Sequence, residues 1–236
     1  SLTNVPPTVF TFYVTGLEAI NSGPNYYAIA GAVAFDVSGN VLGGEQDYND
    51  GYGITSPEPG GDTISASGSS LTVDQTTGLA TLILATNNTY VGVGGVETFA
   101  VQFVNPMHAL ITQFDGTATS SGSMDVQTGT VADGNFAFTL SGTDYNYYPI
   151  ACGGVFSLSS GTISGTADVN DYDSGTVTLG NSLTGTATAA DSYGRGTATV
   201  TVSGTTLSLV YYDVNAEAMR IIDVDAGGVP GAGSAA

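Results

Sequence analysis

The chain has 236 residues, only 10% of them charged, and its 21 acidic side chains are opposed by two arginines and no lysine, giving a net charge of −19. Nucleic acids and anionic membrane surfaces are bound through Lys and Arg, so this charge excludes both as partners. No stretch approaches the roughly 20 consecutive apolar residues of a membrane helix, so membrane insertion is not expected.

The N-terminal half of the chain is predicted to consist of β-strands. Phe10, Phe12 and Val14 alternate with Thr11 and Tyr13, which is the period of a half-buried strand. Turn signals such as "SGN" and "TTG" separate the runs, and no stretch shows a helical period with caps. The expected strands lie near residues 9–16, 26–38, 41–48, 63–74, 79–86, 97–105, 108–115 and 119–127.

The C-terminal half repeats this pattern with shorter loops. Six segments match in the same order: "FTFYVTG" with "FAFTLSG", "YYAIAGAVAFDVSG" with "YYPIACGGVFSLSS", the two acidic D-x-N-D stretches, "GLATLILAT" with "GRGTATVTV", "TFAVQFVN" with "TLSLVYYD", and "ITQFDG" with "IIDVDAG". We therefore predict an N-terminal arm, two β-domains and a Gly/Ala-rich C-terminal tail, at residues 1–8, 9–128, 129–225 and 226–236.

The fold class that follows is all-β, with two tandem duplicated antiparallel domains of about seven to eight strands each. Short turns join neighbouring strands, so a meander is the simplest topology. Each domain is expected to be a small barrel or a two-sheet sandwich, and periodicity does not choose between them. The side chains predicted to fill the first domain are Phe10, Phe12, Val33, Phe35, Phe99 and Phe103.

The stretches "YYAIAGAVAFDVSGNVLGGEQDYNDG" and "HALITQFDGTATSSGSMDVQ" resemble a β-repeat of exported acidobacterial proteins. The resemblance covers most of residues 9–127 and, more loosely, 135–225. It implies export and an all-β fold, and the family has no assigned function or catalytic residues to carry over. The chain also begins at Ser1 rather than Met, as a processed protein would. With few charges and Ser/Thr/Gly-rich strands, an extracellular or cell-surface location is expected.

Two acidic stretches, "DYNDGYG" at 47–53 and "DVNDYDSG" at 168–175, raise the question of calcium. Calcium takes six to eight oxygen ligands from carboxylates, amides and carbonyls on flexible loops. The candidate ligands are Asp47, Asn49, Asp50, Asp168, Asn170, Asp171 and Asp173. The spacing is not that of an EF-hand, and Asp and Asn also stabilise turns, so a duplicated turn explains the recurrence without metal. No other cofactor is expected.

The sequence offers little for catalysis. His108 is the only histidine and Cys152 the only cysteine, and neither has a visible nucleophile or base beside it. Cys152 aligns with Gly31 and is expected to be a small core residue. The tyrosine pairs at 26–27 and 147–148 suit strand-end packing better than ligand stacking. An enzyme is therefore not expected.

The leading functional hypothesis is a structural subunit of an extracellular filament or surface layer, whose partners are copies of itself. The end of the second repeat, "AGGVPGAGSAA", lacks alternation, so this domain is expected to miss its closing strand and expose an edge. A neighbouring copy would donate a strand head-to-tail, with Leu2 and Val5 of the arm filling pockets. The alternative is a secreted barrel that binds a small ligand or carbohydrate.

Overall fold

The computed structural model describes residues 7–20, 23–50, 61–144, 146, 148–225 and 231–236. Leu2 and Val5 lie outside these residues, as does Tyr147. The described chain contains sixteen strands and no helix, so none of its segments is a helix that could cross a membrane. The strands form two closed eight-stranded antiparallel barrels, which confirms the expected all-β duplication and decides for barrels.

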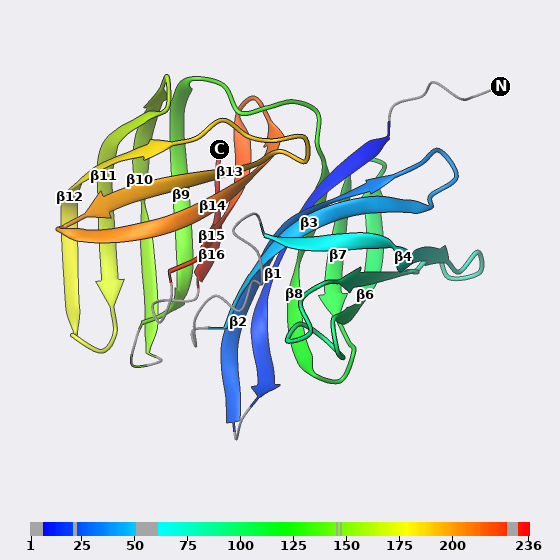
Figure 1. The fold of residues 1–236 in the computed structure, drawn as a ribbon. Coiled ribbons are helices and arrows are strands. Elements are labelled where there is room, and N and C mark those ends of the chain that lie inside the picture. The colour runs from blue at the N-terminus through cyan, green and yellow to red at the C-terminus, as the bar shows by residue number, and fades with distance from the viewer. Residues whose placement is uncertain (1–6, 21–22, 51–60, 145, 147, 226–230) are drawn as a thin grey trace.

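Barrel 1 uses the first eight strands in chain order, and β8 pairs back with β1 to close it (Figure 1). Its strands are β1 (Thr8–Ile20), β2 (Gly23–Phe35), β3 (Val41–Asn49), β4 (Asp62–Val73), β5 (Ala80–Thr86), β6 (Val96–Asn105), β7 (His108–Gln113) and β8 (Ala118–Val126). Each lies close to a range that the sequence predicts, because alternation and turn signals mark the same boundaries.

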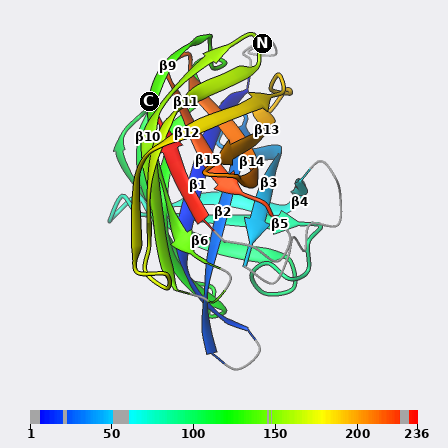
Figure 2. The same cartoon turned by 90° about the vertical axis from the view of Figure 1, so that its left-hand side faces the viewer.

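Barrel 2 repeats this meander with β9 in the place of β1. Its strands are β9 (Gly134–Thr143), β10 (Pro149–Ser159), β11 (Thr162–Asp171), β12 (Thr176–Ala187), β13 (Arg195–Val202), β14 (Thr205–Asn215), β15 (Ala218–Asp223) and β16 (Gly231–Ala235). Figure 2, which looks onto this barrel, shows the red β16 within its wall.

The expectation that the second domain lacks its closing strand is wrong. Gly231–Ala235, part of the presumed tail, forms β16 and pairs on one side with β15 and on the other with β9. The backbone N–H and C=O groups of both neighbouring strands form hydrogen bonds with β16. A segment without large apolar residues therefore still becomes a strand. The open edge required for strand donation is therefore not present between these described strands.

The interior of barrel 1 is filled as predicted. Phe12, Val33 and Phe99 are at most 1% exposed, Phe10 and Phe35 are also buried, and Phe103 packs against them. The rings of Phe10 and Phe35 meet edge to face at 5.8 Å, a favourable arrangement for an aromatic pair. These side chains form the core of barrel 1.

The two barrels pack against each other through outward faces of their strands. On β2 the outward residues Ala28, Ala30 and Ala32 are fully buried, and they contact Tyr212 and Ile222 of barrel 2. Their small side chains let the two walls approach closely, and Figure 1 shows β2 running beside β14, β15 and β16. This contact with barrel 1 holds β14, β15 and β16 in place, and it therefore supports the part of the wall that closes barrel 2.

Candidate ligand-binding cavity

Barrel 2 contains an internal cavity of about 60 Å³. Its wall is almost entirely apolar and comes from most strands of the barrel. The lining residues are Phe138, Leu140, Cys152, Phe156, Leu158, Ile163, Leu183, Ala187, Ala198, Val200, Val202, Leu207, Leu209, Tyr211, Met219 and Ile221. Eight-stranded barrels are just wide enough either to be filled by side chains or to hold one small ligand.

Two of the residues matched by the repeat are smaller in barrel 2 than in barrel 1. Leu82 of barrel 1 corresponds to Ala198 of barrel 2, and Phe99 corresponds to Leu207. Leu82 and Phe99 are at most 1% exposed, whereas Ala198 and Leu207 are only partly buried. Each exchange removes side-chain volume from the wall of barrel 2.

The closing strands differ in the same direction. β8 places the buried Met124 opposite Phe12, whereas β16 places Gly233 opposite Leu140 and Ala235 opposite Phe138. The closing strand of barrel 2 thus carries smaller residues at these positions. A Cβ at residue 233 would lie 1.7 Å from the backbone oxygen of Thr139, so glycine allows β16 to approach β9 closely.

A pocket adjoins the cavity wall at each end of barrel 2. One pocket, of about 440 Å³, shares Leu158, Ala187 and Tyr211 with the cavity wall. The other, of about 170 Å³, shares Leu140, Cys152, Val202 and Leu207. Small-molecule sites usually measure about 300–1,000 Å³, so the cavity alone is too small, whereas the cavity and its two neighbouring pockets together fall within this range.

Tyr211 lies where the cavity meets the larger pocket. Its hydroxyl donates to the carbonyl oxygen of Thr188 at 2.6 Å, and its ring crosses over Gly196 on the neighbouring strand. A Cβ at residue 196 would lie 2.3 Å from the ring, so glycine is needed there. The ring is thereby fixed at the entrance.

Each mouth also carries one buried carboxyl group. Asp213 lines the larger pocket and is 1% exposed, and Asp223 lines the smaller one and is fully buried. In both, Oδ1 accepts a backbone N–H, whereas Oδ2 has no hydrogen-bond partner among the residues that the structure describes. Burial raises the pKa of Asp213 to about 6 and that of Asp223 to about 7. Sequence analysis missed both residues, because neither belongs to an acidic cluster.

The corresponding end of barrel 1 is closed by polar side chains. Tyr27 and Tyr48 are each 1% exposed and lie 6.0 Å apart between ring centres. The Tyr48 hydroxyl donates to Glu18 at 2.6 Å, and the Tyr27 hydroxyl donates to Gln113. In barrel 2 the residues matched to these tyrosines are Tyr148, which is 44% exposed, and the smaller Val169. The mouth near Asp223 therefore lacks the two buried tyrosine side chains that close this end of barrel 1.

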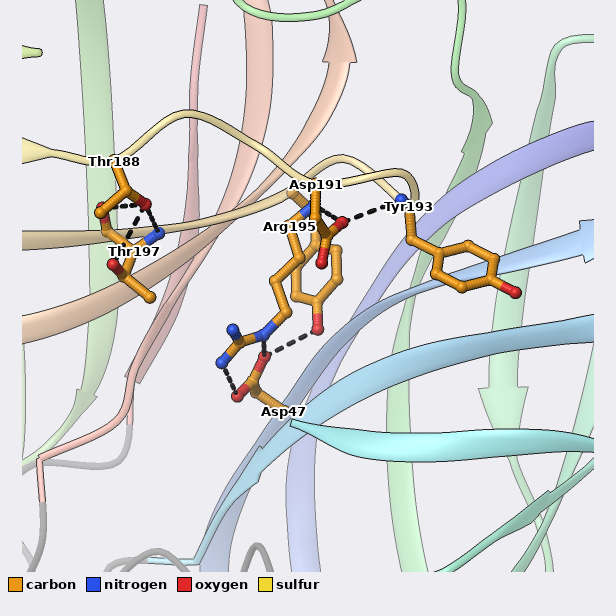
Figure 3. Close-up of polar contacts among 7 residues, drawn as sticks. Asp47, Thr188, Asp191, Tyr193, Arg195 and Thr197 are labelled. Carbon is orange, nitrogen blue, oxygen red and sulfur yellow. Dashed lines mark hydrogen bonds and ion pairs between the residues drawn. The ribbon is translucent and has the colours of Figure 1, made fainter. Parts of the chain in front are cut away.

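The first acidic stretch lies at the interface between the barrels, not in a free turn. Both carboxylate oxygens of Asp47 accept hydrogen bonds from Arg195, and Oδ2 also accepts one from Tyr212 (Figure 3). Asn49 donates to the carbonyl oxygen of Asp223 at 2.8 Å, and Asp50 is buried. Asp47 therefore already has a cationic partner.

The second acidic stretch forms the end of β11 and the following turn. Asp168 accepts the N–H of Gly180 at 2.6 Å, and Asp173 accepts the amide of Asn146 at 2.6 Å. Asn170 is exposed, and Asp171 accepts the N–H of Asp173 at 3.0 Å. Among the described residues, no group of three or more His, Cys, Asp or Glu side chains is arranged to hold a metal. Calcium binding stays a prediction.

The histidine and the cysteine lie in different barrels. His108 Nδ1 is 2.7 Å from Asp125 Oδ1, and Asp125 also pairs with Arg220 across the interface. Cys152 lies in the cavity wall, and burial, followed by the charge of Asp168, raises the pKa of its thiol. A raised pKa disfavours the thiolate, which is the nucleophilic form.

Comparisons with known proteins leave the function open. No protein-family model matches the chain, and no curated protein matches it. One solved structure that it resembles is a protein from Nitrosomonas europaea provisionally assigned as AttH, at 10% identity and a TM-score of 0.33, covering 97% of this chain and 92% of that one. At this TM-score the likeness carries no argument.

Proposed function

We propose that barrel 2 binds a small apolar molecule in its interior, while barrel 1 acts as a solid scaffold. The observation that carries this proposal is the apolar cavity inside barrel 2, at a place where the matched barrel 1 packs the larger side chains of Leu82 and Phe99. Apolar residues that line a cavity and stay partly exposed lose stabilising contacts, and a bound ligand would restore them.

The contents of the wall favour binding over catalysis. The cavity lining has one thiol, whose pKa is raised, and no histidine or carboxylate; the carboxyl groups of Asp213 and Asp223 lie only in the pockets at the two mouths. General acid–base and nucleophilic catalysis both need such a group within hydrogen-bond reach of the reacting atoms. We therefore keep the proposal that the protein is not an enzyme.

Naphthalene is a suitable probe, since it is apolar and its fluorescence is emitted at longer wavelength than that of tyrosine. We expect saturable binding to the wild-type protein. Ala198→Leu combined with Leu207→Phe gives barrel 2 the residues of barrel 1, and should weaken binding at least tenfold by filling the cavity. The matched control is Thr199→Ile, which changes the exposed face of the same strand to the residue at the matched position in barrel 1, Ile83.

The control should bind naphthalene as the wild type does. If the wild type does not bind naphthalene, or if the filled variant binds it equally well, the proposed function is wrong. A higher melting temperature for the filled variant would show that the added side chains occupy the cavity without disrupting the barrel.

Assembly into a filament or surface layer is a second proposal, and it has lost its expected mechanism because β16 closes barrel 2. Self-association would need a contact other than donation into that edge. An extracellular location is likewise a proposal, supported by the low content of charge and the absence of lysine.

A further inference from the structure

One buried acceptor is satisfied in barrel 1 and left without a partner in barrel 2. Gln113 ends β7 inside barrel 1, and the repeat matches it with Asp223 at the end of β15. The hydroxyl groups of Tyr27 and Ser120 both donate to Gln113 Oε1, the second at 3.3 Å. Barrel 1 therefore provides its own donors for this position.

Barrel 2 has lost both of these donors. Tyr148, which corresponds to Tyr27, is 44% exposed and packs against Tyr172 with ring centres 6.0 Å apart. Gly231 on the closing strand takes the place of Ser120, so no hydroxyl is available there. Asp223 Oδ1 accepts the N–H of Asp225 at 2.8 Å, and Oδ2 is buried without a partner.

An empty space lies where those donors would be. The pocket of about 170 Å³ that Asp223 lines is also lined by Ile150, Val169 and Gly231, and it shares four lining residues with the apolar cavity: Leu140, Cys152, Val202 and Leu207. A buried polar atom without a partner destabilises the folded state, and it does so more strongly when it is charged. A ligand that supplies a donor at this point removes that destabilisation, whereas an apolar ligand does not.

We infer that the ligand of barrel 2 is an uncharged apolar molecule with a hydroxyl end, an apolar alcohol or a phenol, which donates its hydrogen bond to Asp223 Oδ2. Its apolar body would occupy the cavity, and its hydroxyl would stand where the Tyr27 hydroxyl stands in barrel 1. A carboxylate ligand is disfavoured, because it would meet an acidic side chain in a protein of net charge −19. This inference rests on the proposed function of barrel 2.

The test compares three ligands with the same ring system: naphthalene, 2-naphthol and 2-naphthoate. At pH 8 we expect 2-naphthol to bind at least tenfold more tightly than naphthalene, since a hydrogen bond to a charged group contributes more than one between neutral groups. 2-Naphthoate should bind more weakly than naphthalene. Asp223→Asn should reduce the affinity for 2-naphthol at least fivefold and leave that for naphthalene unchanged.

Asp213→Asn makes the same change at the opposite mouth and is the matched control, with an expected effect below twofold. If naphthalene binds but 2-naphthol has no advantage, or if Asp223→Asn has no effect, the inference is wrong and the proposed function stands. A loss caused by Asp213→Asn instead would also contradict it, because the hydroxyl would then lie at the other mouth. Unchanged naphthalene binding by each variant shows that the barrel is intact.

Discussion

Arg195 of barrel 2 holds the carboxylate of Asp47 in barrel 1 with two hydrogen bonds, Nε to Oδ2 at 2.8 Å and Nη2 to Oδ1 at 2.9 Å. The side chains are 11% and 5% exposed. Tyr212 completes the arrangement by donating to Asp47 Oδ2 at 2.7 Å. Removing one partner of a buried, bidentate ion pair of this kind is strongly destabilising, because the remaining charge stays buried without its counterion.

Removing only the arginine should destabilise the protein and weaken the coupling between the unfolding of the two barrels. Arg195→Met leaves Asp47 buried without its cation, and we expect a loss of roughly 3–5 kcal/mol in the free energy of unfolding. Calorimetry should show the melting transition broaden or split as the barrels uncouple. Adding Asp47→Asn should recover part of the lost free energy of unfolding, because residue 47 then carries no buried charge. Equal losses in the single and double variants would contradict the pairing of Arg195 with Asp47.

Emptying the two aromatic cores should have unequal effects. Phe35 lies in the filled interior of barrel 1, and Phe35→Ala should destabilise the protein by about 3–5 kcal/mol. Phe156 already borders the cavity of barrel 2, so Phe156→Ala removes fewer contacts and should cost about 1 kcal/mol less. Urea unfolding of both variants measures this difference, and a larger loss for Phe156→Ala would mean that barrel 2 is the better packed barrel.

A buried glutamate in barrel 1 should make stability depend on pH. Glu97 is fully buried with no hydrogen-bond partner of ordinary geometry. Burial raises its pKa to about 8, opposed by the neighbouring Gln46 side chain and reinforced by Asp115 and Asp62. The folded state therefore retains a proton that the unfolded chain loses near pH 4.5, and stability falls as pH rises from there to about 8.

Glu97→Gln removes this titration. The slope of unfolding free energy against pH should become less steep by up to ~1.4 kcal/mol per pH unit between pH 5 and 8. The comparison isolates Glu97, since Glu18 and the other buried acids titrate in both proteins. Parallel curves for the wild type and the variant would show that Glu97 is ionised in the fold.

Truncation after Asp225 should open barrel 2. Without β16, the edges of β15 and β9 lose their ladder partners, and unpaired edges promote association with other chains. We expect a lower melting temperature and concentration-dependent oligomers in light scattering. Removing residues 1–6 is the contrasting change, because β1 begins at Thr8; it should leave the melting temperature unchanged. A truncated protein that stays monomeric and stable would show that β16 contributes little.

The sequence predicts most strands because their inward residues are large and regularly spaced. β6 is an example, with Phe99 and Val101 buried where alternation places them. β16 escapes this reasoning, since "GAGSA" has no large apolar residue and depends on two existing edges and on the packing of Ala232 against barrel 1. Its stability is a tertiary effect, which local pattern does not contain.

The sequence contains a signal for the cavity. Aligning the repeats shows that Leu82 becomes Ala198 and Phe99 becomes Leu207, so a loss of volume in barrel 2 was predictable. Whether other side chains would refill that volume was not predictable. It depends on Met219, which is larger than its counterpart in barrel 1, and on Tyr211, which is similar in size to its counterpart. The interface also had a signal, in the alternate alanines on the outward face of β2.

The chain's two arginines, Arg195 and Arg220, both lie between the barrels and are 11% and 19% exposed. With no lysine in the chain, the rest of the outer surface has carboxylates and no guanidinium or lysine ammonium group to offset them. Two copies that approach each other therefore meet as like-charged polyanions, and the repulsion weakens only as salt shortens the Debye length from about 30 Å at 0.01 M to about 8 Å at 0.15 M. In dilute buffer the protein should remain dispersed, and any contact between copies should form as counterions accumulate around it.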